Sequence, residues 1–192
     1  MSYNFFALIN RMKYIDRWGL MRNTQRENIQ EHSHMVAVLA HALAVIGKEE
    51  FGSTVDPGEA AIAGLYHDAS EILTGDLPTP VKYDNPAIKD AYKAVERVAA
   101  DKLLSMLPQE LQGELAPYVR EELEPELLKV VKAADKLAAH IKCLEELTAG
   151  NTEFRLAAQQ TRAALDKIDL PALRYFMKEF LPGFQLTLDE LQ

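Results

Sequence analysis

Residues 126–148 read ELLKVVKAADKLAAHIKCLEELT, and this stretch decides the fold class. Its apolar residues recur every three or four positions and form one stripe: Leu127, Val130, Val131, Ala134, Leu137, Ala138, Ile141 and Leu144. This period predicts an amphipathic helix that buries one face. Glu124-Pro125 lies before the stretch and Ala149-Gly150 after it, so the sequence marks both ends of the helix.

The same period predicts helices along most of the chain. Asn28, with Glu31 three residues later, is a predicted capping box for a helix that runs to about Lys48. Asp56-Pro57 opens a helix predicted to run to about residue 73. Further helices are predicted at residues 2–13, 86–106, 108–119, 152–167 and 170–180. We find no alternating strand of useful length, and therefore predict one all-α domain over residues 1–192.

Composition narrows the class of protein. The 192 residues are 48% hydrophobic and 26% charged, values that exclude disordered, collagen-like and low-complexity classes. The single cysteine, Cys143, forms no internal disulfide and fits a reducing compartment. No run approaches the roughly 18 apolar residues of a membrane helix, and the apolar run at Phe5–Ile9 is too short for a signal-peptide core. We expect a cytoplasmic protein without a membrane partner.

The charge balance bears on the partner. Lys plus Arg number 21 and Asp plus Glu number 29, which gives a net charge of −8. A nucleic-acid polymer needs a broad basic face, so we expect no such partner. A small anion needs only a local cation, and an acidic protein can supply one.

Asp135 is the most informative single residue, because it falls inside the apolar stripe of residues 126–148. A buried carboxylate without a partner costs several kcal/mol, so Asp135 needs a cation. Lys132, three residues earlier, is one candidate. A metal ion is the other.

Two other segments supply the rest of a ligand set. His32 shares a helical face with apolar residues and points inward; a core histidine is the simpler interpretation of it alone. His67-Asp68 follows an apolar run, and Glu71 lies at helical spacing from both; an exposed helix-end cluster is the alternative. Together with Asp135 these residues form the order H…HD…D. Mixed imidazole and carboxylate ligands suit one divalent first-row metal such as Mn, Co, Fe, Ni or Zn.

This order is the signature of the HD-domain metal-dependent phosphohydrolases. The chain closely resembles the bacterial HD-domain 5′-deoxynucleotidase family over residues 5–190. The motifs that carry the resemblance are IDRW (15–18), REN (26–28), EHS (31–33), YHDASE (66–71), LTGDLPTPVKY (73–83) and KCLEEL (142–147). The HD pair alone is weak, whereas the Arg-Trp pair together with the TGDLPTP loop is specific.

The resemblance implies a single HD-domain helical bundle that hydrolyses deoxyribonucleoside 5′-monophosphates, works as a homodimer and tolerates different bases. By similarity, the ligands of one divalent cation, Co, Mn or another first-row metal, are His32, His67, Asp68 and Asp135. Glu71 is expected to handle the proton, and Arg17 to clamp the phosphate as a second catalytic residue. The remaining expected substrate contacts are Trp18 at the sugar, Asp68, Asp135 and the loop residues Asp76, Leu77, Pro78 and Thr79.

Each of the added roles has a simpler alternative. Arg17 is also explained by a surface ion pair with Asp16 or a nearby Glu, Trp18 by core packing, and Asp76 by turn formation. At the level of function, one alternative is an HD phosphohydrolase for a nucleoside triphosphate or a cyclic nucleotide. A triphosphate needs more cations than the motifs offer: Arg17, Arg22, Arg26 and Lys82. The other alternative is a non-catalytic helical module that binds metal or nucleotide.

Overall fold

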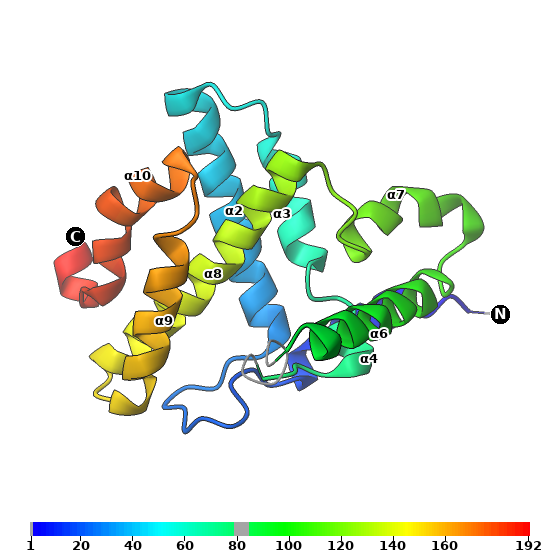
Figure 1. Ribbon diagram of the computed structural model, residues 1–192, viewed down its shortest axis with the longest axis horizontal. Coiled ribbons are helices and arrows are strands. Elements are labelled where there is room, and N and C mark those ends of the chain that lie inside the picture. Colours follow the sequence, from blue (N-terminus) through cyan, green and yellow to red (C-terminus); the bar gives the residue numbers. More distant parts are fainter. Residues whose placement is uncertain (1, 79–84) are drawn as a thin grey trace.

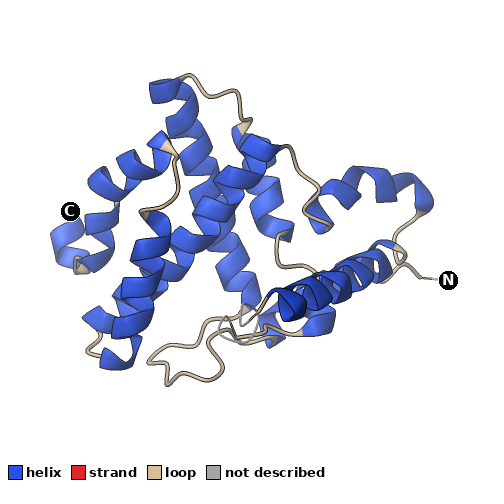
Figure 2. Cartoon of the chain, in the orientation of Figure 1, coloured by secondary structure: helices blue, strands red, loops and turns tan. Residues whose placement is uncertain are grey.

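The computed structural model describes residues 2–78 and 85–192. In this part of the chain helices are joined by loops, and the one β-contact is an isolated bridge between Asp16 and Asn28 (Figure 2). The helices are α1 Phe5–Ile9, α2 Ile29–Phe51, α3 Pro57–Tyr66, α4 Glu71–Thr74, α6 Pro86–Leu104, α7 Gln109–Val119, α8 Pro125–Thr148, α9 Arg155–Leu165 and α10 Pro171–Glu179. Short 3-10 helices are η1 Asn10–Tyr14, η2 Thr152–Phe154, η3 Leu181–Gln185 and η4 Leu188–Leu191. The predicted all-α class is confirmed.

Helix α8 is the central element of the core. It crosses α2, with α9 and α10 toward one end of the molecule and α3, α6 and α7 toward the other (Figure 1). The predicted stripe on α8 is buried from Leu127 to Ile141, and Leu144 is partly buried against the same cluster. Leu39 and Leu43 of α2 and Leu173 of α10 pack into this cluster. The helix that carries Asp135 is therefore held on several sides.

Sequence signals placed several helix ends correctly. The Asn28 side chain accepts hydrogen bonds from the amides of Gln30 and Glu31, and the Glu31 side chain completes the capping box. Asp56 caps the amide of Glu59 at the start of α3. At the N-terminus the predicted helix over residues 2–13 is shorter, because α1 ends at Ile9 and tightens into η1.

The helix predicted from Pro57 to about residue 73 was wrong in its second half. Helix α3 ends at Tyr66, and residues 67–70 form a turn before α4 starts at Glu71. The His67 ring nitrogen Nδ1 lies 2.8 Å from the carbonyl oxygen of Gly64, which a continuing helix would pair with the amide of Asp68. His67 and Asp68 therefore lie on a turn beyond the helix end.

Gly64 brings α3 unusually close to α2. A Cβ atom at this position would lie 2.7 Å from Cα and 2.8 Å from N of Ala37, and backbone atoms cannot move aside as a flexible side chain can. The short approach positions His67, three residues after Gly64, beside His32 of α2, with ring centroids 5.3 Å apart. The missing side chain is thus part of how the site is built.

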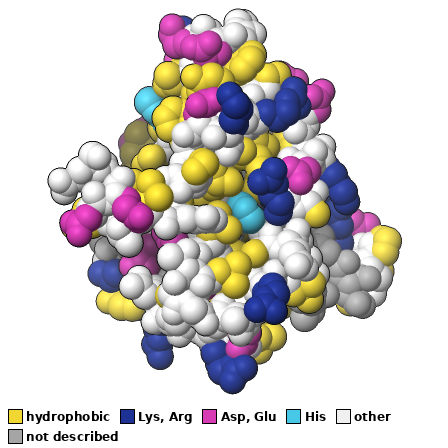
Figure 3. Space-filling model, turned by 90° about the vertical axis from the view of Figure 1, so that its left-hand side faces the viewer, with side chains coloured by type: hydrophobic (Ala, Val, Ile, Leu, Met, Phe, Trp, Pro, Cys, Tyr) yellow, Lys and Arg dark blue, Asp and Glu magenta, His cyan; other side chains and the backbone are white. Residues whose placement is uncertain are grey.

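The outer surface mixes side-chain types. On the face that carries α9 and α10, lysines and arginines are scattered among hydrophobic and acidic side chains (Figure 3). Among the helices that the structure describes, none has both the length and the apolar character needed to cross a membrane.

Gly64→Ala should destabilise the fold by about 1–3 kcal/mol, because the added methyl group is forced against the α2 backbone. Chemical denaturation followed by circular dichroism measures the change. Gly113→Ala is the matched control: Gly113 lies inside α7 with nothing within 4 Å of its virtual Cβ, so alanine should be neutral or stabilising there. Equal stabilities of the two variants would contradict the close-approach argument.

Candidate metal centre and active site

The predicted ligand set converges from three separate elements. His32 comes from α2, His67 and Asp68 from the turn after α3, and Asp135 from α8. One ligand atom each of His32, His67 and Asp135 lie within 4.8 Å of one another. Asp68 Oδ2 is 3.1 Å from His67 Nε2 and 3.8 Å from His32 Nε2. The structure thus brings all four predicted ligands together.

One of the two imidazoles, that of His67, is arranged as a metal-binding imidazole usually is. His67 uses Nδ1 to donate to the Gly64 carbonyl at 2.8 Å, which leaves Nε2 facing Asp68. This nitrogen is buried, and within the described residues it has no hydrogen-bond partner. A metal-binding histidine typically fixes its second nitrogen in this way. The chemistry of the donor set, two imidazoles and two carboxylates, therefore fits a first-row dication.

The carboxylates of Asp68 and Asp135 are partly buried and are held in the charged form. Burial acts to raise the pKa of Asp68, but the charges of His67 and Arg17 outweigh it and hold that pKa far below its ordinary value. Burial likewise acts against Asp135, and its hydrogen bond with His32 and the charge of Lys136 still bring its pKa well down. Both groups are therefore anionic at neutral pH.

The cation facing Asp135 is not the one that helix spacing offered. Lys132 binds the two carboxylate oxygens of Glu121 at 2.5 and 2.8 Å. Asp135 instead meets His32 Nε2 at 3.1 Å and Lys136 Nζ at 3.4 Å. Burial and the nearby Arg17 act to lower the pKa of His32, whereas its hydrogen bond with Asp135 and the carboxylate of Glu27, 3.7 Å from Nδ1, outweigh them and raise it. Asp135 thus has an imidazole and an ammonium group as its polar neighbours.

Arg17 lies in the loop between η1 and α2 and borders this cluster. Its side chain is only 13% exposed, with Nη1 at 3.3 Å from Asp68 Oδ2 and Nε at 3.3 Å from Glu27 Oε2. Of the partners that the surface-pair alternative named, Asp16 pairs with Arg26, whereas a nearby glutamate, Glu27, does pair with Arg17, although not at the surface. Burial acts to lower the pKa of Arg17, but the carboxylates around it, Asp68 foremost, raise it.

Trp18 lies beside Arg17 in the same loop. Its indole Nε1 donates to Glu27 Oε2 at 2.8 Å, and its ring packs on Phe154 with centroids 5.4 Å apart. Its φ of 57° lies in the left-handed region, which a bulky residue rarely adopts. Trp18 thus packs against the buried cluster around Phe154, as the core-packing alternative holds, and its backbone is in addition held in an unusual conformation.

The remaining predicted residues follow α3. Glu71 is the first residue of α4 and is 4% exposed. Asp76, Leu77 and Pro78 are partly buried beyond α4, and the charge of Asp76 is among those that raise the pKa of Arg17, so this loop runs near Arg17. Thr79 lies outside the described residues. The Tyr92 hydroxyl donates to the Gly75 carbonyl at 3.2 Å, which ties the start of the loop to α6.

A cleft of about 510 Å³ opens beside His67 and Asp68. Cationic side chains line it that no motif signalled: Lys89, Lys93, Arg97, Arg120 and Lys132. Three of them are already ion-paired, Arg97 with Glu122, Arg120 with Asp101 and Lys132 with Glu121. The four-residue spacing of Lys89, Lys93 and Arg97 on one helix was the available signal.

A second group missed by the sequence anchors the loop that carries Arg17 and Trp18. Glu146 of α8 is 1% exposed and accepts from the Thr24 amide at 2.9 Å and from Lys142 Nζ at 2.5 Å. Lys142 also donates to the Gln25 carbonyl at 2.6 Å. The signal was present in the sequence, since Lys142 and Glu146 are an i,i+4 pair on a largely buried helix.

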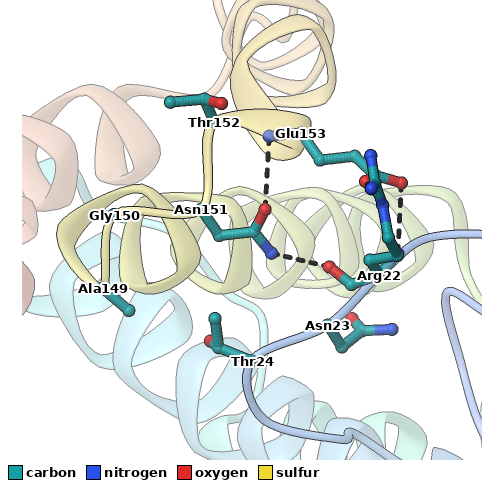
Figure 4. Close-up of a pocket in the computed structure, with 8 residues that line it drawn as sticks. All are labelled: Arg22, Asn23, Thr24, Ala149, Gly150, Asn151, Thr152 and Glu153. Carbon is teal, nitrogen blue, oxygen red and sulfur yellow. Dashed lines mark hydrogen bonds and ion pairs between the residues drawn. The ribbon is translucent and has the colours of Figure 1, made fainter.

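The same anchor continues at the end of α8. There a hollow of about 530 Å³ lies between residues 22–24 and 149–153, and none of the predicted site residues lines it. Asn151 donates to the Arg22 carbonyl and to Glu146, and its side-chain oxygen accepts from the Glu153 amide (Figure 4). Arg22 and Glu153 also form an ion pair. These polar groups satisfy one another, so we assign the hollow to loop anchoring.

Comparison with known proteins identifies the family. A family model described as 5′-deoxynucleotidase YfbR-like matches residues 4–184. The chain belongs to this family. It is 50% identical to the 5′-deoxynucleotidase VP0926 of Vibrio parahaemolyticus, over 98% of this chain and 97% of that protein. It is also 50% identical to the 5′-deoxynucleotidase YfbR of Escherichia coli, over 98% of this chain and 95% of that protein.

Solved structures agree on the fold. An HD-domain phosphohydrolase from Listeria innocua superimposes with a TM-score of 0.83 at 23% identity, over 96% of this chain and 90% of that one. The HD phosphohydrolase DatZ of cyanophage S-2L, solved with dA and one catalytic Zn²⁺, gives a TM-score of 0.66 at 22% identity, over 97% and 100%. The YfbR-like chain described here therefore has the HD-domain fold, as its motifs predicted.

Glu146→Gln should reduce stability at neutral pH, and this difference from wild type should shrink as the pH falls. Burial acts to raise the pKa of Glu146, but its hydrogen bonds with Lys142, Thr24 and Asn151 bring that pKa well below the ordinary value of 4.5. A carboxyl group with a depressed pKa stabilises the fold fully above its unfolded value, and this contribution is lost as the pH falls below about 4.5.

Urea unfolding of the metal-free protein between pH 3 and 8 measures this difference. Glu145→Gln, at the exposed neighbouring position, is the control and should not reproduce the loss. If the difference in the free energy of unfolding between wild type and Glu146→Gln stayed constant down to pH 3, this would contradict the stabilising role of the Glu146 carboxylate.

Proposed function

We propose that this YfbR-like chain is a metal-dependent 5′-deoxynucleotidase that hydrolyses deoxyribonucleoside 5′-monophosphates to deoxynucleoside and phosphate. One observation supports this most strongly: a buried arginine, Arg17, borders the converged His32, His67, Asp68 and Asp135 side chains. A dication and a guanidinium at one place suit a phosphate dianion, even in a protein of net charge −8. The full-length relatives named as 5′-deoxynucleotidases point to the same reaction.

The four ligands are proposed to hold one dication, Co, Mn or another first-row metal. When bound, it supplies Lewis-acid stabilisation to the phosphoryl group and activates water. His67 is oriented for this by its bond to the Gly64 carbonyl, and the anionic Asp68 and Asp135 balance the charge of a dication. The metal-dependence of the family and the His/Asp cluster support the assignment.

Arg17 is proposed as the phosphate clamp. Its Nε edge is held by Glu27, while Nη1 lies on the side of the cluster at Asp68. A guanidinium is planar and permanently charged. The edge of Arg17 that carries its Nη nitrogens therefore offers a fixed pair of donors to phosphoryl oxygens. Because the side chain is largely buried, solvent screens this charge less than at the surface.

Glu71 is proposed as the proton-handling residue. It is buried, stands three residues after Asp68, and is outside the proposed ligand set. A carboxyl group in this place can accept a proton from the attacking water or return one to the leaving 5′-oxygen. Phosphate-monoester hydrolysis is among the slowest uncatalysed reactions, so charge stabilisation and positioning must supply about 20 kcal/mol together with this proton transfer.

Trp18 and the loop at Asp76, Leu77, Pro78 and Thr79 are proposed to form the sugar side of the site. A wall there would leave a ribose 2′-hydroxyl buried and unpaired, which costs about 1–3 kcal/mol. About 1.4 kcal/mol of this already gives a tenfold preference for deoxyribose. The constrained backbone of Trp18 and the partly buried loop near Arg17 support this placement.

The cations of the cleft bear on the alternative substrate, a nucleoside triphosphate. The cleft beside His67 adds five cations to those near the motifs, and in the described part of the chain Lys89 and Lys93 have no ion-pair partner. Two free surface lysines are a small addition for a triphosphate, so the monophosphate is favoured.

The single domain over residues 1–192, the homodimer and the cytoplasmic location stay predictions. Limited proteolysis tests the first, light scattering the second and cell fractionation the third.

A nucleotide panel tests the function. After chelation and addition of Mn, Co or Mg, the wild-type protein should release phosphate from deoxyribonucleoside 5′-monophosphates at least tenfold faster than from AMP, and faster than from dNTP or cyclic substrates. Glu71→Ala should abolish turnover and still bind metal. Trp18→Ala should reduce the ratio of dAMP to AMP activity.

Three outcomes would contradict parts of this proposal. Bound metal without phosphate release from any nucleotide would favour the non-catalytic module. Loss of metal binding in Glu71→Ala would give Glu71 a structural role. Full discrimination between dAMP and AMP in Trp18→Ala would remove Trp18 from the sugar wall.

A further inference from the structure

Glu27 contacts more of the site than any predicted role explains. Its Oε2 accepts from Trp18 Nε1 at 2.8 Å and from Arg17 Nε at 3.3 Å. Its Oε1 is the carboxylate oxygen facing His32 Nδ1, at 3.7 Å. The side chain is 15% exposed and lies just before the Asn28 cap of α2.

We propose that Glu27 is a positioning residue that couples the metal centre to the substrate site: one carboxylate oxygen orients His32 for the metal, and the other holds Arg17 and Trp18 for the substrate. The substrate half rests on the proposed function. The metal half and the placement of Trp18 do not, since both are properties of the free protein.

The contact of Glu27 with His32 bears on the tautomer of the imidazole. His32 is completely buried, and its Nε2 faces Asp135 at 3.1 Å and Asp68 at 3.8 Å. Nε2 can bind a metal only if the ring proton is on Nδ1. That Nδ1 is buried and has no hydrogen-bond partner among the described residues. Glu27 Oε1 is in place to accept from it after a movement of about 1 Å.

His67 shows the same device in another form. Its Nδ1 donates to a backbone carbonyl, that of Gly64, whereas His32 has a carboxylate on this side. Partners of this kind fix the ring orientation and the tautomer, and their removal typically lowers metal affinity about 10- to 100-fold.

The contacts of Glu27 with Arg17 and Trp18 bear on the strained backbone of Trp18. Trp18 has a φ of 57°, and for a bulky residue this conformation costs about 1–3 kcal/mol and persists only where surrounding contacts impose it. Glu27 supplies contacts from both its parts: its side chain binds the indole, and its carbonyl accepts from the Arg17 amide at 2.8 Å. The adjacent β-bridge between Asp16 and Asn28 also constrains the backbone on either side of Arg17 and Glu27.

Only a carboxylate meets both demands. All three neighbouring groups, Arg17 Nε, Trp18 Nε1 and a His32 Nδ1–H, are donors. A glutamine has one accepting oxygen, so either its amide nitrogen faces His32 and favours the wrong tautomer, or it faces Arg17 and Trp18 and both bonds are lost. Glu27→Gln therefore removes the charge and one accepting oxygen, while it keeps the size of the side chain.

The test uses Glu27→Gln without any substrate. Calorimetric titration of chelated protein with Mn²⁺ should show affinity about 10- to 100-fold below wild type. Trp18 is the only tryptophan in the chain, so the intrinsic fluorescence of the metal-free protein reports its environment directly. We expect the emission of Glu27→Gln to differ from wild type, because the indole loses a carboxylate acceptor.

Glu153→Gln is the matched control. Glu153 also accepts from an arginine Nε, that of Arg22 in the same loop, but it contacts none of the proposed metal or substrate residues. It should keep wild-type Mn²⁺ affinity and emission. Glu27→Asp keeps two accepting oxygens and should recover part of the metal affinity. If Glu27→Gln loses its helical circular dichroism, Glu27→Asp is measured against Glu153→Gln by the same two readouts.

Unchanged Mn²⁺ affinity in the folded Glu27 variant would overturn the metal half, and unchanged emission would overturn the Trp18 half. At saturating Mn²⁺ the remaining defect should fall on KM for dAMP more than on kcat. If wild type hydrolyses no nucleotide while both substrate-free effects appear, the proposed function fails and the positioning role of Glu27 stands.

Discussion

The contact between His32 of α2 and Asp135 of α8 is the interaction on which the site depends. A carboxylate in the apolar stripe of the central helix is costly to bury alone, and a buried imidazole is costly when charged. At 3.1 Å each group offsets the cost of the other. The close approach of α3 to α2 at Gly64 then places His67 and Asp68 beside this pair.

A second constraint is that the substrate residues lie in irregular chain. Arg17 and Trp18 lie outside the helices. Contacts at two places hold their loop in position instead. Near the site, Glu27 binds both side chains and the adjacent backbone. At the far end, the buried Lys142–Glu146 pair of α8 holds residues 24 and 25. The same helix thus carries a proposed metal ligand and the anchor of the substrate loop.

Much of the fold and the cluster followed from local sequence signals. The stripe of residues 126–148, the Asn28 capping box and the Asp56 cap each act within a few residues, so periodicity and capping rules reach them. Asp135 stood out because a charge inside an apolar stripe needs a partner. Its partner was open between Lys132 and a metal, since helix spacing alone does not show that Glu121, from the preceding turn, captures Lys132.

Other features depend on three-dimensional contacts. At the helix break of residues 67–70 the His67 ring contacts the Gly64 carbonyl, a side-chain contact that no helix propensity encodes. The cations of the cleft come from α6, from the residue that follows α7 and from α8, and they meet His67 only after folding. Glu27 stood in a quoted motif, yet its role depends on three donors that converge from residues 17, 18 and 32.

The most direct test of the central claim is a crystal structure of the cobalt-loaded protein with anomalous scattering at the cobalt edge. The account predicts one peak with His32 and His67 nitrogens and Asp68 and Asp135 oxygens at about 2.0–2.2 Å, distances usual for such ligands on a dication of this size. A peak elsewhere on the chain, or a cobalt ion that lacks either Asp135 or His32, would contradict it.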